Sequence, residues 1–253
     1  MKPIKQFFLL TALAITSTFQ SCLDEDKNTV TYQPAVGTVD NENGKLLFDT
    51  DYYGVLEPLN TTIFSNYDAD EDGQRVMASI VFMDNSETQK TDNYKQIQVL
   101  ELYKILTKNA DSLTEGQEDV YGNDPILISG GYISKEHLNL EFNIWRNDAS
   151  IAHRISLVLT EKSELDENGM IHVELRHNAE SDQQYTLAWG LVSFNLSSIP
   201  GYNDENFKGF IIEHSGQNGQ TSTVTIKKDN NNAKSNQTGI SAPINECTYI
   251  EKS

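Results

Sequence analysis

The segment Asp68–Gly73, which reads DADEDG, carries the clearest chemical signal in the chain. Its three aspartates, Asp68, Asp70 and Asp72, stand at alternate positions, and a glycine follows them directly. Alternate carboxylates before a glycine form the first half of the EF-hand calcium loop, where they converge on one ion. The choice lies between a calcium site and an acidic turn between two strands.

The flanks of this segment favour the turn. In a calcium loop that began at Asp68, the last position would hold a bidentate glutamate, but this chain has Ser79 there. Ser79 also lies inside 75–83, where apolar residues alternate as in a strand. We expect an acidic turn that leads into this strand. A looser calcium site, with Asp49 or Asp51 as a further ligand, stays open.

A second candidate is a pair of histidines on two neighbouring predicted strands. His153 lies on the apolar face of 151–160, and His177 lies on the apolar face of 170–177. A turn around 166–169 joins the two segments, so they can form an antiparallel hairpin. If residue numbers across the hairpin sum to 330, the two histidines lie opposite each other on the same face.

This histidine pair admits two interpretations. Two histidines are half of a tetrahedral metal site, and a third ligand would come from Asp182, Glu174 or His214. The other interpretation, which we favour, is a pair of core histidines that bind each other by a hydrogen bond. A change of one residue in this sum would turn the two histidines to opposite faces and break the pair.

Signals for catalysis and for nucleic-acid binding are missing from the sequence. Zincin, thiol-protease and nucleophile-elbow motifs do not occur. Carboxylates are abundant, yet none stands out as a glycosidase-like pair across a cleft. The formal net charge is −18, a field that repels phosphate backbones, so we expect no nucleic-acid partner.

Aromatic residues suggest one binding surface. Tyr52, Tyr53, Phe64 and Tyr67 cluster near predicted loops and strand ends, beside Asn and Asp side chains. Exposed aromatic rings next to such polar groups could stack against sugars. The alternative is that these rings fill and cap the core of a small barrel.

The elements that must position these residues are strands. Apolar residues alternate at period two through most of the chain, and turn signals such as Asn43-Gly44 and Asp72-Gly73 separate the runs. The first half predicts five strands, which suits a small barrel. The second half predicts seven, which suits an immunoglobulin-like sandwich. The predicted strands are 36–40, 45–50, 54–59, 75–83 and 94–106, then 126–129, 138–145, 151–160, 170–177, 186–196, 208–215 and 221–227.

The N-terminus predicts export and lipidation. Residues 1–21 have a positive start and a short apolar run, as in a signal peptide, and Cys22 follows directly. We expect a lipidated Cys22 followed by an acidic tether over 22–34; a secreted chain with a free thiol is the alternative. The acidic run 23–26 is either a signal for surface exposure or a solvated tether.

The polar tail 229–253 shows no periodic pattern, and we expect it to be disordered. It holds Cys247, the second of two cysteines in the chain. With Cys22 lipidated, no disulfide can form within the chain, so stability must come from the core.

Several segments together resemble the NigD-like family of Bacteroidetes lipoproteins. They are GNDPILI (122–128), HLNLEF (137–142), HRISLVL (153–159), ELRHNAESD (174–182), SFNLSSI (193–199) and, in the first half, the step GQRV (73–76). The resemblance covers roughly residues 35–228. It implies an OB-like N-terminal domain, a C-terminal β-sandwich, a lipoprotein of the cell envelope and an association with a bacteriocin locus. It supplies no catalytic residue.

The expected fold is therefore all-β: a small OB-like β-barrel in 35–108, then an immunoglobulin-like β-sandwich in 109–228. The expected function is that of a non-enzymatic, lipid-anchored envelope protein that binds or shields. A surface module that binds glycans or peptides is the second hypothesis, and a hydrolase is the third. We expect no cofactor apart from the open calcium site. The expected partners are the outer membrane, through the lipid, and a protein or glycan on its periplasmic or outer side.

Overall fold

A computed structural model describes residues 32–41, 44–83 and 94–228. The predicted signal peptide, Cys22, most of the tether and the tail with Cys247 lie outside these residues. All described residues belong to one compact unit. None of the helices within these ranges is long and apolar enough to cross a membrane.

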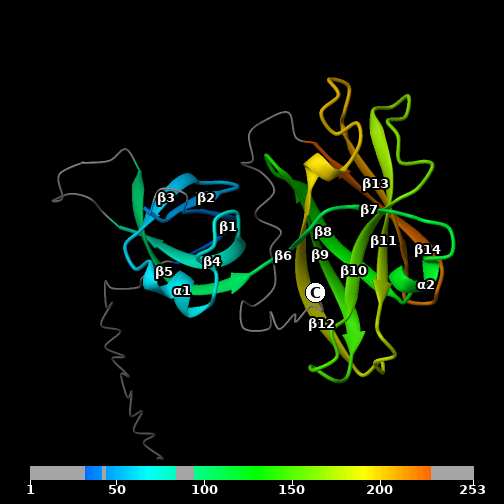
Figure 1. The fold of residues 1–253 in the computed structure, drawn as a ribbon, viewed down its shortest axis with the longest axis horizontal. Coiled ribbons are helices and arrows are strands. Elements are labelled where there is room, and N and C mark those ends of the chain that lie inside the picture. The colour runs from blue at the N-terminus through cyan, green and yellow to red at the C-terminus, as the bar shows by residue number, and fades with distance from the viewer. Residues whose placement is uncertain (1–31, 42–43, 84–93, 229–253) are drawn as a thin grey trace, which may run out of the picture. The chain divides into compact units, whose positions relative to one another are not determined.

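The first five strands close into a barrel in the order β1-β2-β3-β5-β4 (Figure 1). All five predicted strands of the first half are present. Their bounds are β1 (Gln33–Asp40), β2 (Leu47–Thr50), β3 (Gly54–Pro58), β4 (Arg75–Phe82) and β5 (Lys95–Lys104), with the short helix α1 (Thr62–Asn66) between β3 and β4. The parallel pairing of β3 with β5 completes the ring, which removes the open sheet edges of this domain.

The barrel core forms from the inward residues of each strand. On β4 these are Val76, Ala78 and Ile80, as the alternation predicts. Phe64 of α1 packs edge-on against Phe48 of β2, with ring centroids 6.2 Å apart, and both rings are fully buried. The helix therefore plugs the barrel with an aromatic side chain.

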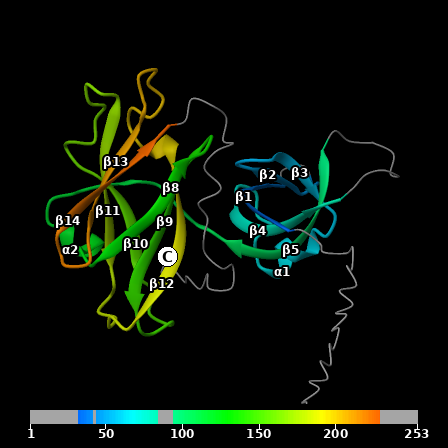
Figure 2. The same cartoon turned by 180° about the vertical axis from the view of Figure 1, so that it is seen from behind.

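The second domain is a sandwich of two sheets around one core (Figures 1 and 2). All seven predicted strands are present, together with two short strands, β6 and β7, that the sequence did not predict. One sheet has the order β14-β13-β11-β10-β7 and the other has the order β6-β12-β9-β8. The bounds are β6 (Leu106–Lys108), β7 (Asp111–Ser112), α2 (Glu118–Tyr121), β8 (Ile126–Ile133), β9 (His137–Arg146), β10 (Arg154–Leu159), β11 (Met170–Asn178), β12 (Thr186–Asn195), η1 (Leu196–Ser198), β13 (Gly209–Ser215) and β14 (Thr221–Lys227).

β6 lies at the end of the predicted barrel domain, and β7 lies at the start of the predicted sandwich domain, before its first predicted strand. β6 pairs in parallel with β12, and β7 pairs in parallel with β10, so each strand joins a sheet of the sandwich. Strands of three and two residues carry too little alternation to be seen in the sequence. Their pairing is decided by the sheet edges they reach.

The register of the β10–β11 hairpin differs from the predicted one. Ile155 lies opposite His177, so residue numbers across the pair sum to 332 rather than 330. The connection between the two strands explains the shift, because Ser163 ties the end of β10 to the start of β11. Its hydroxyl accepts from Thr160 N and donates to His172 O. A shift of two residues keeps every side chain on its predicted face.

Polar residues of β9 also differ from expectation. The apolar face of Leu138, Leu140, Phe142 and Ile144 packs in the sandwich core, as the alternation predicts. The opposite face carries polar residues in the sequence, yet Asn139 and Glu141 on it are only 0% and 5% exposed. This second face of the sheet is therefore covered.

The barrel supplies part of this cover. A small apolar cluster joins Val36, Met77 and Ile105 to Leu191 of β12. Met77 lies on the face of β4 that points away from the barrel core, so β4 is buried on both faces. The two domains consequently share a buried junction with apolar and polar parts.

Candidate binding sites

The polar part of the junction is built around Arg75, whose side chain is 1% exposed at the start of β4. Its Nη1 and Nη2 atoms donate to Oδ1 and Oδ2 of Asp51 at 2.7 and 2.6 Å, which makes a bidentate ion pair. From the sandwich, Asn139 Oδ1 accepts from Nη2 at 2.7 Å, and Ser193 Oγ lies 3.5 Å from Nε. Tyr132 completes the group by donating to Asp51 Oδ2 at 2.8 Å.

Charges in this network are stable near neutral pH. Burial by itself would lower the pKa of Arg75, but the hydrogen bond and charge of Asp51 raise it. Burial and the same carboxylate raise the pKa of Tyr132 well above its ordinary value, so its hydroxyl stays a donor. Ser193 Oγ also donates to Asn139 Oδ1, at 2.7 Å. This oxygen therefore accepts one hydrogen bond from Arg75 of the barrel and one from Ser193 of the sandwich.

A cleft of about 620 Å³ opens over this network. Residues from both domains line it, and the charged ones balance: three acids (Asp49, Asp51, Glu136) against three bases (Arg75, Lys135, Lys228). The aromatic lining consists of Tyr52 from the barrel and Tyr202 and Phe207 from the sandwich. We call this site the junction cleft.

Besides Arg75, His137 and Asp49 are lining residues of the junction cleft whose pKa values are shifted. Burial and the nearby Arg75 lower the pKa of His137 to about 4, so its ring is neutral at pH 7. Burial raises the pKa of Asp49; Lys135 opposes this shift, and Asp51 adds to it. The cleft therefore presents a neutral ring, a carboxylate and two lysines over the buried Arg75–Asp51 ion pair.

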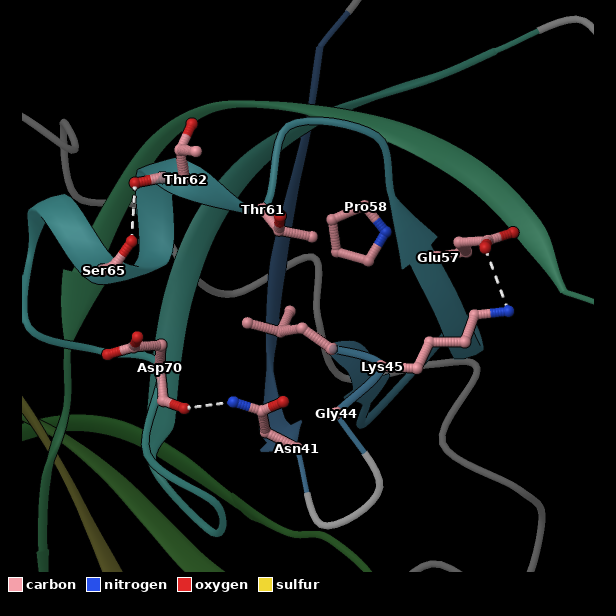
Figure 3. A pocket seen from close by; sticks show the side chains of 10 residues that line it. Asn41, Gly44, Lys45, Glu57, Pro58, Thr61, Thr62, Ser65 and Asp70 are labelled. Atoms are coloured by element: carbon pink, nitrogen blue, oxygen red, sulfur yellow. Dashed lines mark hydrogen bonds and ion pairs between the residues drawn. The ribbon is translucent and has the colours of Figure 1, made fainter.

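A second, smaller pocket of about 400 Å³ lies on the barrel beside α1 (Figure 3). Its lining is mostly polar, with Thr61, Thr62 and Ser65 at one side. Lys45 and Glu57, which form an ion pair at 3.0 Å, line the other side. We call this site the barrel pocket.

The acidic turn borders the barrel pocket. Asn41 holds it in place: its Nδ2 donates to Asp70 O at 2.9 Å, as Figure 3 shows, and its main-chain N donates to Asp72 Oδ1 at 2.9 Å. Asp68 has a positive φ of 53°, and its Oδ2 lies 3.4 Å from Lys104 Nζ. Asn41 therefore binds Asp70 through its main-chain oxygen and Asp72 through its carboxylate, while Lys104 pairs with Asp68.

Neither of the two further acids considered for a calcium site joins this turn. Asp51 is bound to Arg75, and Asp49 lines the junction cleft. Within 32–41, 44–83 and 94–228, no group of three or more His, Cys, Asp and Glu side chains is arranged to hold a metal ion.

The structure brings His153 and His177 together at one end of the sandwich. His153 Nδ1 lies 2.9 Å from His177 Nε2, and His153 Nε2 lies 3.1 Å from Asp182 Oδ2. His177 Nδ1 lies 3.0 Å from Pro125 O. Of the three suggested third partners, Asp182 is the one that meets this pair, because Glu174 binds Arg176 and His214 binds Ile126 O.

Hydrogen-bond chemistry assigns the protons of this histidine chain. Pro125 O only accepts, so His177 Nδ1 must carry hydrogen. The carboxylate of Asp182 accepts as well, so the hydrogen of the bond between His153 Nε2 and Asp182 Oδ2 lies on His153. Backbone bonds from Asn147 and the bond from His153 outweigh burial and lower the pKa of Asp182 to about 2. Burial lowers the pKa of His177 to about 4, so at pH 7 its ring is neutral and its Nε2 faces His153 as an acceptor.

The four aromatic residues considered for sugar stacking do not share one surface. Phe64 is buried in the barrel core, and Tyr67 is 55% exposed. Tyr52 packs edge-on against Tyr53 with centroids 4.7 Å apart, and Tyr53 continues to Phe82 at 5.2 Å. Tyr52 alone of the four lines the junction cleft.

Sequence reasoning missed the residues that build the junction cleft. Arg75 appeared only as part of the GQRV step, although an arginine within a run of Val, Met, Ala and Ile is itself a signal of a buried ion pair. Asn139 and Ser193 carried no signal. Their role depends on a barrel residue that is 64 and 118 positions away along the chain.

Comparisons with known proteins agree with this architecture. Residues 109–228 match the model of the NigD-like C-terminal beta sandwich domain. A solved structure from Parabacteroides distasonis, described as a toxin-related protein, is 28% identical with a TM-score of 0.62, over 81% of this chain and 96% of its own. No match was found among curated proteins.

Two further solved structures share the fold at lower identity. A NigD-like immunity protein from Bacteroides caccae is 17% identical with a TM-score of 0.55, over 78% of this chain and 92% of its own. A protein from Bacteroides fragilis described as a lipoprotein is 12% identical with a TM-score of 0.59, over 79% and 98%. Through residues 109–228 this chain is similar to the C-terminal β-sandwich domain of the NigD-like family.

Proposed function

We propose that this protein is a non-enzymatic, lipid-anchored protein of the bacterial envelope that acts by binding a partner in the junction cleft. The observation that carries the proposal is the cleft itself, about 620 Å³ in volume and built over a buried ion pair. Clefts of this size at domain junctions are common binding sites. Asp51 and Arg75 are held by each other, and His137 is neutral, which suits recognition better than proton transfer.

The lipid anchor at Cys22 is supported by the signal-like residues 1–21 and by the structural neighbour described as a lipoprotein. An anchor at this position, followed by an acidic tether, would hold the folded unit near the outer membrane, on its periplasmic or outer side.

A bacteriocin-associated role is a more specific version of this function. Its support comes from two structural neighbours, one described as a NigD-like immunity protein and the other as toxin-related. In such a role the protein would bind or shield at the envelope. Expression in a bacteriocin-sensitive Bacteroides strain should then raise survival, and a Tyr52→Ala variant should lose that protection.

Metabolic labelling with an alkyne fatty acid tests the anchor. The wild-type protein should incorporate the label and sediment with membranes, and a Cys22→Ala variant should do neither. Cys247→Ala is the matched control because it removes the other cysteine of the chain. Equal labelling of the Cys22→Ala variant would contradict the lipid anchor.

A further inference from the structure

We propose that the junction cleft binds a neutral oligosaccharide. This inference rests on the proposed binding function and adds the class of ligand. The argument uses three properties of the cleft: its charge, its aromatic walls and the elements that line it.

Charge distinguishes the cleft from the rest of the molecule. The chain carries 37 acids against 19 bases, yet the cleft holds three of each. Arg75 and Asp51 neutralise each other in the floor, and Lys135 lowers the pKa of Asp49 against the effect of burial. The negative field of the whole chain would repel a polyanion. A polycation would not be attracted to the cleft in particular, because its acidic and basic residues are equal in number. A ligand without net charge is the one that this balance suits.

The walls offer the two kinds of contact that a sugar requires. Tyr52 and Tyr202 are half-buried and come from different domains, so each presents part of a ring to the cleft. Aromatic rings bury apolar surface and keep a polar tip in water, which matches the apolar faces and hydroxyl edges of a pyranose. Asn203, Lys135 and Glu136 are exposed at the rim and provide both donors and acceptors.

The elements that line the cleft argue against an extended peptide as the ligand. Peptides in grooves usually add a strand to an open sheet edge or insert apolar side chains into pockets. The rim here consists of turn residues, 134–136 between β8 and β9 and 202–203 after η1. These turns present side chains rather than a row of unpaired main-chain groups.

Binding of the purified protein to an array of neutral gluco-, manno-, galacto- and xylo-oligosaccharides tests the inference, with anionic glycans on the same array. At least one neutral glycan should bind, with little dependence on salt, and isothermal titration should confirm it. Tyr52→Ala and Asn203→Ala should weaken binding by tenfold or more. Thr62→Ala, in the barrel pocket, is the matched control and should bind as the wild type does. The bound glycan should be recovered intact.

The other outcomes separate this inference from the proposed function. Binding only to anionic glycans, reversed by salt, would overturn the charge argument. If no glycan binds, but a photocrosslinker at position 52 captures one envelope protein and Asn203→Ala abolishes the capture, the saccharide assignment fails and the binding function stands. If neither occurs, both proposals fail.

Discussion

At the scale of single residues, the molecule depends on polar groups that are buried and fully partnered. The guanidinium of Arg75 donates hydrogen bonds to Asp51, Asn139 and Ser193. A buried ion pair adds little net stability compared with an apolar pair, but an unpaired member is costly. The network therefore defines how the domains meet rather than how strongly the chain folds.

The Arg75–Asp51 pair leads to a prediction about single and double variants. Asp51→Asn should lower the free energy of unfolding by about 3–5 kcal/mol, because it leaves a buried guanidinium without its counter-charge. Combining it with Arg75→Met should cost less than the sum of the two single changes. Urea unfolding of the four proteins measures this, and strictly additive effects would contradict the coupling.

The two histidines with lowered pKa values predict sensitivity to acid. His137 and His177 have pKa values of about 4 in the folded chain, against 6.5 for an ordinary imidazole. Between these values the unfolded chain binds more protons, so stability falls as the pH decreases from 6.5 to 4. Each ring should contribute up to about 3 kcal/mol to this loss. Urea unfolding across this range should show the slope, and His137→Gln should reduce it; a flat profile would refute the assignment.

At the scale of elements, close strand contacts depend on two glycines. An added Cβ on Gly37 of β1 would lie 2.7 Å from Thr50 Cα on β2, and one on Gly190 of β12 would lie 2.5 Å from Phe142 Cζ. The first obstacle is main chain in a closed barrel and cannot move aside. The second is a ring in a packed core, where extra volume is also poorly tolerated.

We therefore predict that Gly37→Ala destabilises the protein by about 1–3 kcal/mol. Gly130→Ala on β8 is the matched control, because the nearest atom to its added Cβ is 3.9 Å away and its φ is negative. Thermal unfolding followed by circular dichroism compares the two. Equal melting temperatures for both variants would show that β1 and β2 can separate.

At the scale of the whole molecule, the junction should make the two domains unfold together. Both tryptophans, Trp145 and Trp189, lie in the sandwich, and Trp189 also packs against the apolar cluster of the junction. Their fluorescence therefore reports the sandwich and its contact with the barrel, while circular dichroism reports both domains. The two signals should give one coincident transition in the wild type. Leu191→Asp, which buries a charge in the apolar part of the junction, should separate them. Separate transitions in the wild type would show that the junction is weak.

The sequence by itself determined the longer strands of both domains and the faces of their apolar residues. This was possible because alternation at period two is a local property, visible in any run such as 138–144. The same local reasoning placed His153 and His177 on the inner face even though its register was shifted by two residues. A shift of two residues leaves each side chain on the same face of the sheet, but it changes which residue lies opposite on the neighbouring strand.

Only the tertiary structure decided what covers each outer face and which distant side chains meet. Nothing in the sequence marks Asn139 as a partner of Arg75, which reaches it from the other domain. β6 and β7 form strands because each pairs with the edge of a sheet in the sandwich. The three aspartates at 68, 70 and 72 had the spacing of calcium ligands, but Asn41 and Lys104 hold two of their carboxylates apart. Spacing along a chain specifies what residues could do, and long-range packing specifies which partners they have.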